Sequence, residues 1–321
     1  MAGTHTKLKG IDHFSKETLT NQIEKNIIDY FNYALLEVGA FYTVHAPQSG
    51  LYGGRNTNLR LVDDPNYTKG RVWEGYRNDW VWETGIDYRT QPIRVSGVTV
   101  NGTFHPTSGT GSFSHIVDYP QGRIIFNSAI SSTATVQCSF SHRAVTFTNT
   151  DAPWFREIQK DTFRVDDATF SQFGSGNWNQ LSLNRVNLPA VAVDSIIRPD
   201  APGLELGGGQ KIKHIIGFYV IAQNAADRNK IADCIAYQKE KDIFLYDINA
   251  VPQHRQPLNS AGSPALSGYS YPEMVAPSSD GGFRWRFARF ESAQIKRMQT
   301  FNPKLYAAEV FVTLEVAMHN L

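Results

Sequence analysis

The chain has 321 residues, of which 41% are hydrophobic and 19% are charged, and its 31 Lys and Arg nearly balance 30 Asp and Glu. That length accommodates one large domain or two smaller ones with a real core, and the composition excludes an intrinsically disordered chain. A net charge of +1 also disfavours a protein held to DNA mainly by its overall charge, because such proteins carry a basic excess.

The N-terminal residues 1–16 are polar and lack a hydrophobic period, so we expect a flexible arm and no signal peptide. The chain contains no apolar run of about 18 residues, which predicts that it does not cross a membrane. The two cysteines, Cys138 and Cys234, lie far apart and form no zinc motif. We expect two free, buried thiols, which suits a reducing cytoplasm.

An amphipathic helix is the first regular element that the sequence predicts. Apolar residues recur every three to four positions between Leu19 and Val38, which is the spacing of one helix face. Thr18 or Ser15 can cap the start, and Gly39 can end the helix. The apolar stripe needs a sheet or a neighbouring subunit to bury it.

Residues 45–92 combine many glycines and aromatic residues without a helical or strand period. Long segments without regular structure are uncommon in compact domains unless they have a role. We expect a packed, extended loop region, which is either a contact surface between subunits or an irregular layer over the domain's own core. The candidate interface residues are Trp73, Tyr76, Trp80, Trp82 and Tyr88.

Residues 93–148 predict several short antiparallel strands. Asn101 and Gly102 form a strong two-residue hairpin signal. Pro120 and Gly122 favour a second tight turn between two runs that are rich in strand-forming residues. This succession of short strands and turns is typical of a small β-sandwich or barrel.

The second half of the chain predicts an α+β module. The apolar run 215–222 indicates a strand, and Asn224 can cap the helix that follows it. The run 306–317 alternates apolar and polar residues, as in a strand with one buried face. We therefore expect an arm at 1–16, a region with the helix, the aromatic loop and the β-sandwich at 17–150, and an α+β module with long antiparallel strands at 151–321.

No motif in the sequence indicates a catalytic or metal-binding site. The glycines 207–209 before Lys211 lack the frame of a phosphate-binding loop, and we interpret them as a turn before a strand. The histidines are scattered singly, whereas a zinc site needs several ligands at defined spacing. We therefore expect a protein that is not an enzyme and that binds neither a cofactor nor a metal.

One basic cluster lies in an alternating run near the C-terminus. Arg284 and Arg286 are two residues apart and therefore share a strand face, and Arg289 is close to them. These residues either face DNA or an acidic partner, for instance in the lumen of a ring, or belong to an ordinary solvated strand face.

Two stretches resemble proteins of tailed bacteriophages. Residues 118–126 contain an aspartate–tyrosine turn, a glycine and a strand that ends in Phe126, and residues 131–140 add a Ser/Thr-rich spacer and a strand that ends in Phe140. Together they resemble a β-module that is frequent in virion proteins. The C-terminal module, one helix against long antiparallel strands, is similar in outline to tail-terminator and tail-completion folds.

The resemblance implies a non-enzymatic structural subunit of the virion, in an oligomeric ring at the head–tail junction (neck, connector or tail terminator) or in the tail. Its partners would be further copies of itself and other neck or tail proteins, with non-specific contact to DNA in a channel. It would reside in the virion after assembly in the host cytoplasm. The alternative is a baseplate or fibre protein that binds a carbohydrate or receptor through the aromatic segment 73–88. No functional residue carries over, since these families act through surfaces.

Overall fold

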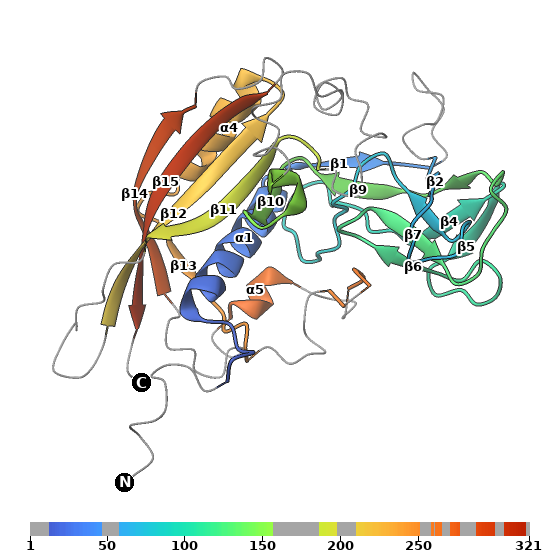
Figure 1. Ribbon diagram of the computed structural model, residues 1–321, viewed down its shortest axis with the longest axis horizontal. Helices are drawn as coiled ribbons and strands as arrows, with labels where there is room; N and C mark the ends of the chain where they lie inside the picture. Colours follow the sequence, from blue (N-terminus) through green and yellow to red (C-terminus); the bar gives the residue numbers. More distant parts are fainter. Residues whose placement is uncertain are drawn as a thin grey trace, which may run out of the picture.

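The computed structural model describes residues 13–46, 58–156, 186–197, 210–250, 258–259, 261–264, 270–276, 287–298 and 305–318. A large curved sheet with its helices occupies one end of the molecule, and a group of short strands occupies the other (Figure 1). The α+β class predicted from the sequence is confirmed, with an N-terminal helix, antiparallel strands and a helix on the C-terminal sheet. Among the described helices, none has the length and apolar character needed to span a membrane.

The larger part is built on a six-stranded sheet with the order β10-β11-β12-β15-β14-β13. β10 and β11 are parallel, and the other neighbouring pairs are antiparallel. The strand bounds are β10 Thr146–Asn149, β11 Ala190–Ile197, β12 Gln210–Ala222, β13 Asp242–Phe244, β14 Phe287–Arg297 and β15 Tyr306–Met318. The long strands β12, β15 and β14 are adjacent, so residues that are about a hundred positions apart in the sequence form the centre of the six-stranded sheet.

Helix α1 (Leu19–Glu37) buries its apolar stripe against this sheet. Phe31 is 2% exposed, and its ring centroid lies 5.1 Å from that of Phe147 in β10 and 5.4 Å from that of Phe218 in β12. Of the two ways to cover the stripe, a sheet or a neighbouring subunit, the chain uses its own sheet. The helix predicted within residues 17–150 therefore shares a core with strands from the second half of the chain.

Helix α4 (Ala225–Ala236) packs against β12, β14 and β15, with Ile231, Ala232 and Ile235 buried in the same core as α1. Asn224 caps it as the sequence predicts, because its side-chain oxygen accepts a hydrogen bond from the backbone N–H of Asp227 at 2.8 Å. A third helix, α5 (Tyr271–Met274), is a single turn that lies near α1.

The smaller part contains a four-stranded sheet β2-β3-β7-β6, a three-stranded sheet β5-β4-β8 and the ribbon β1-β9. These strands are β1 Phe41–Val44, β2 Arg60–Val62, β3 Val72–Glu74, β4 Gly97–Val100, β5 Thr103–Pro106, β6 His115–Asp118, β7 Arg123–Phe126, β8 Val136–Gln137 and β9 Phe140–Arg143. All pairs are antiparallel, and one apolar cluster joins the sheets, as expected for a small sandwich.

Both predicted hairpins are present in the smaller part. Asn101 and Gly102 have positive φ angles of 49° and 85° between β4 and β5, as a two-residue hairpin turn requires. Gly122 has a φ of 63° between β6 and β7. A Cβ at this position would lie 2.6 Å from the backbone oxygen of Arg77, so glycine is needed both for the turn and for this close approach.

Candidate functional site

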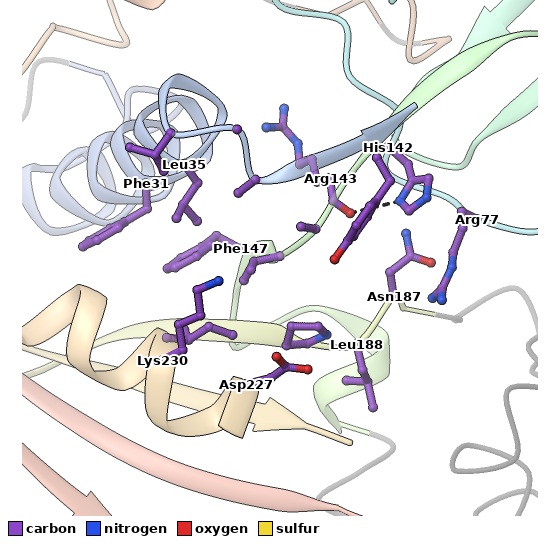
Figure 2. Close-up of a pocket in the computed structure, with 18 of the residues that line it drawn as sticks. Phe31, Leu35, Arg77, His142, Arg143, Phe147, Asn187, Leu188, Asp227 and Lys230 are labelled. Carbon is purple, nitrogen blue, oxygen red and sulfur yellow. Dashed lines mark hydrogen bonds between the residues drawn. The ribbon is translucent and has the colours of Figure 1, made fainter. Parts of the chain in front are cut away.

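A cleft of about 770 Å³ lies where the larger and smaller parts meet. Its walls come from the C-terminal half of α1, from α4, from the ribbon β1-β9 and from residues 187–189, which lead into β11. Figure 2 shows these segments around a common space. The volume lies within the range of about 300–1,000 Å³ that is usual for ligand pockets, so we treat this cleft as the candidate site.

One end of the cleft is apolar. Phe31, Leu35 and Phe147 lie together there (Figure 2), and the rings of Phe31 and Phe147 are stacked with an interplanar angle of 3°. Two further lining residues are unusually exposed for their type, Val38 at 67% and Tyr42 at 63%. Val38 at the apolar end and Tyr42 near His142 therefore form a rim that meets solvent.

The other end is polar and centres on His142, which is 5% exposed. Its Nδ1 atom lies 3.1 Å from the backbone oxygen of Arg143. Because a carbonyl oxygen only accepts, Nδ1 must carry the proton and Nε2 is then an acceptor. Burial, with a smaller contribution from the charge of Arg77, lowers the pKa of His142 to about 4, so the ring is neutral at pH 7.

Aromatic and amide groups surround this histidine. Tyr42 lies opposite His142 in the β1-β9 ribbon, with ring centroids 5.5 Å apart, and Tyr76 lies 6.2 Å away, edge to face. Asn187, also at this end (Figure 2), donates its Nδ2 to the backbone oxygen of Asn78 at 2.7 Å. Its Oδ1 is thus the second side-chain acceptor at the polar end.

The charges along the cleft are mainly positive. Lys230 of α4 is exposed and lines the cleft, and within the described part of the chain no carboxylate pairs with it. Asp227 lies one turn earlier on α4, and its Oδ2 already accepts a hydrogen bond from Asn224 at 2.7 Å. Arg77 adds a second positive charge at the polar end.

Arg143 lines the cleft but uses its guanidinium to join the two parts of the molecule. Its Nε donates to Asp79 at 3.1 Å, its Nη1 donates to the backbone oxygen of Asn32 in α1 at 3.0 Å, and its Nη2 pairs with Glu83. The arginine is 4% exposed. A buried charge satisfied in this way fixes geometry, because losing any partner would leave an uncompensated charge.

The five aromatic residues predicted as an interface do not form one exposed patch. Trp73 and Trp80 are 3% and 0% exposed in the core of the smaller part, and the ring of Trp80 stacks on Phe140 at 4.4 Å. Tyr76, Trp82 and Tyr88 are half-buried, and of these Tyr76 contributes to the cleft wall. Both tryptophans are therefore part of the chain's own core, which is the second of the two predicted alternatives.

The predicted basic cluster is only partly described. Arg284 and Arg286 lie outside the described residues. Arg289 is exposed on β14, with its Nη1 3.7 Å from Asp242 Oδ1. The neighbouring exposed groups on this sheet face form pairs of opposite charge, such as Lys213 with Glu291 at 2.5 Å, so the described part of the face carries mixed charge.

Both cysteines are free thiols, as expected. Cys138 is buried in the smaller part, as predicted, but the prediction of a buried thiol is wrong for Cys234, which is half-buried and lines the cleft. Burial raises the pKa of each thiol. Within the described residues, no group of three or more His, Cys, Asp or Glu side chains is arranged to hold a metal ion.

Sequence patterns did not indicate the cleft, because its residues come from separate segments. His142 and Asn187 carry no local motif, and Lys230 looks like any exposed lysine on a helix. Only the packing of α1 and α4 on one sheet brings these residues together. No model of a known protein family matches the chain, and no curated protein is significantly similar to it.

Proposed function

We propose that this protein is a non-enzymatic structural subunit of a tailed-phage virion, which assembles into an oligomeric ring at the head–tail junction (neck, connector or tail terminator) or in the tail. Its partners would be further copies of itself and other neck or tail proteins, and DNA passing through the ring would make only non-specific contacts.

The observation that carries this proposal is the form of the larger part. Two helices bury their apolar faces in one core against a sheet whose adjacent strands β12, β15 and β14 are 13, 13 and 11 residues long. This outline is similar to tail-terminator and tail-completion folds. A similar fold is only an analogy, because one fold can host many functions. The proposal therefore also rests on the exposed face of the long strands and on the contacts of the buried arginines.

The opposite face of the long strands suits contact with other subunits. It carries charge pairs between strands, including Lys211 with Glu315 at 2.6 Å and Lys296 with Glu309 at 3.3 Å. Phe244 and Phe287 add two 42% exposed rings whose centroids are 4.9 Å apart. Aromatic residues are enriched in the core of protein interfaces, and the rim around that core is polar.

The most deeply buried charges also have structural partners. Arg123, in the smaller part, donates from Nε to Glu74 at 2.9 Å and from Nη1 to Asp64 at 3.2 Å. These contacts connect β7, β3 and the loop that contains Asp64. Together with the Arg143 contacts they hold strands and loops in place, a role that a structural subunit requires.

The alternative, a baseplate or fibre protein that binds a carbohydrate or receptor, would need aromatic rings that sugars can reach. Trp73 and Trp80 are buried, so these rings are not accessible for stacking in this conformation. Among the described residues of the smaller part, Tyr42 and Phe104 are the most exposed large aromatic rings, at 63% and 56%, and they would be the place to look if a glycan array gave a signal.

Oligomeric mass tests the proposal. Sedimentation equilibrium of the purified chain, alone and mixed with neck and tail proteins of the same particle, should give a discrete closed oligomer in at least one condition. A strictly monomeric chain at about 100 µM, which also fails to associate with any of these proteins, would contradict it.

A further inference from the structure

We propose that the cleft between α1, α4 and the β1-β9 ribbon binds an extended, acidic segment of another polypeptide, with an aliphatic or aromatic side chain inserted beside Phe31 and Leu35. The source of that segment, another virion protein, rests on the proposed function. The recognition itself rests only on the residues of the cleft.

The apolar end provides the anchor for such a side chain. Phe31, Leu35 and Phe147 form its walls, and Val38 leaves two-thirds of its surface in water at the rim. Removing apolar surface from water is favourable roughly in proportion to the area that is covered. A partner side chain placed here would therefore bury both its own surface and the exposed surface of Val38.

The polar end has hydrogen-bond acceptors that match a peptide backbone. His142 Nε2 is an acceptor because Nδ1 carries the ring proton and donates it to the backbone oxygen of Arg143. Asn187 Oδ1 is an amide oxygen and therefore an acceptor, and the Nδ2 of the same side chain donates to the backbone oxygen of Asn78. An extended peptide carries backbone N–H groups that require acceptors. A fatty acid in its ionised form has no donor to offer these two atoms.

Charge selects an acidic segment over a basic one. Lys230 stands on one wall and Arg77 at the polar end, and these two cations outnumber the single carboxylate of Asp227, which keeps its charge while it accepts a hydrogen bond from Asn224. A carboxylate next to the anchor side chain would meet Lys230 without having to displace a partner within the described residues. Opposite charges across an interface steer association and suppress wrong partners.

The exposed rim favours a segment over a small enclosed ligand. Val38 and Tyr42 lie at the edge of the cleft with most of their surface in water, so an occupant that extends beyond the cleft can cover them. Tyrosine is also among the residues that most often dominate binding energy in protein interfaces.

The test uses two fluorescein-labelled peptides with blocked ends, one acidic (Asp-Leu-Phe-Asp-Leu) and one basic (Lys-Leu-Phe-Lys-Leu), whose binding to the full chain is measured by fluorescence anisotropy. We expect the acidic peptide to bind at least about fivefold more tightly than the basic peptide, with a preference that weakens as salt is added. Binding should also slow the reaction of Cys234 with a thiol reagent, because Cys234 lines the cleft whereas Cys138 is buried.

Matched variants locate the binding site. Lys230→Glu should weaken the acidic peptide about tenfold, whereas Lys239→Glu, the same charge change just beyond the end of α4 and outside the cleft lining, should leave binding within about twofold. Leu35→Trp should block the apolar end. Lys230 is exposed, so Lys230→Glu keeps the test informative even if Leu35→Trp does not fold.

Four results would overturn the proposal: no binding of the acidic peptide, equal affinity for both peptides, equal effects of the two lysine variants, or unchanged reactivity of Cys234 with peptide bound. Dodecanoate binding that Leu35→Trp abolishes, without peptide binding, would assign the cleft to a small amphiphile instead. Each result is obtained on the isolated chain, so failure here leaves the ring proposal to be judged by oligomeric mass.

Discussion

The two parts of the molecule are stabilised in different ways. The larger part relies on apolar contact across long sequence distances, since α1 packs on strands β10, β12 and β14. The smaller part joins short strands by tight turns and by a buried arginine, Arg123, that holds two carboxylates. We expect the larger part to depend most on side-chain packing and the smaller part on turn geometry and buried ion pairs.

The largest effect should come from a charge in the core of the larger part. Phe31→Asp removes four ring contacts at centroid distances between 5.1 and 6.1 Å and places a carboxylate where the side chain is 2% exposed. The loss should be about 5 kcal/mol or more, measured by urea unfolding. A soluble variant with an unchanged midpoint would show that α1 does not hold the sheet.

Replacing a buried arginine in each position compares an ion-pair network that joins the two parts with one that lies within the smaller part. Arg143→Met leaves Asp79 and Glu83 without their main cation and removes the bond to α1, so it should cost about 3–5 kcal/mol. Arg123→Met, a matched change within the smaller part, should cost a similar amount.

The two arginine variants should differ in where the structure opens. Limited proteolysis is expected to cut Arg143→Met between the two parts, and Arg123→Met within the smaller part alone. Identical cleavage patterns would mean that the two parts unfold as one cooperative unit, and the comparison would then fail.

A smaller effect is expected at the turn between β6 and β7. Gly122→Ala strains a φ of 63° and brings a Cβ to 2.6 Å from a backbone oxygen, which should cost about 2 kcal/mol. Gly111 has a φ of 99°, but a Cβ added there would meet no atom within 4 Å. Thermal unfolding of Gly111→Ala therefore reports backbone strain without a close contact. An unchanged midpoint for Gly122→Ala would exclude the steric contact as a source of strain.

The smallest effect concerns pH and the larger part. Burial raises the pKa of Asp29 on α1 to about 6, although Tyr246 donates a hydrogen bond to its Oδ2 at 2.5 Å. Because the folded pKa lies above the unfolded value, this group favours folding at low pH, and that contribution is lost as the pH rises through about 6.

Asp29→Asn should therefore flatten the dependence of unfolding free energy on pH between about 4 and 7. The comparison is made by urea unfolding at several pH values, with wild type and variant in the same buffers. A wild-type slope that persists in the variant would assign the titration to another group.

Local patterns in the sequence predicted α1, α4 and the long strands, but not what lies against them. The prediction of a loop region without regular structure at 45–92 is wrong for β2 and β3, whose three-residue lengths are too short to show a strand period. The α1 stripe and the turns at Gly102 and Gly122 depend on neighbouring residues, so they could be predicted from the sequence. Whether Trp73 and Trp80 are buried or exposed could not be predicted from the sequence, because tryptophan is common both in cores and in interfaces. The cleft depends on contacts between residues more than a hundred positions apart, such as Phe31 and Phe147.

The central claim is the proposal that the chain is a ring subunit of a virion, and imaging tests it most directly. Electron microscopy of virions in which this chain carries a small gold-binding tag should place the label in a ring at the head–tail junction or along the tail. Label confined to a fibre or baseplate tip, or absent from purified virions that retain full infectivity, would contradict the assignment as a ring subunit.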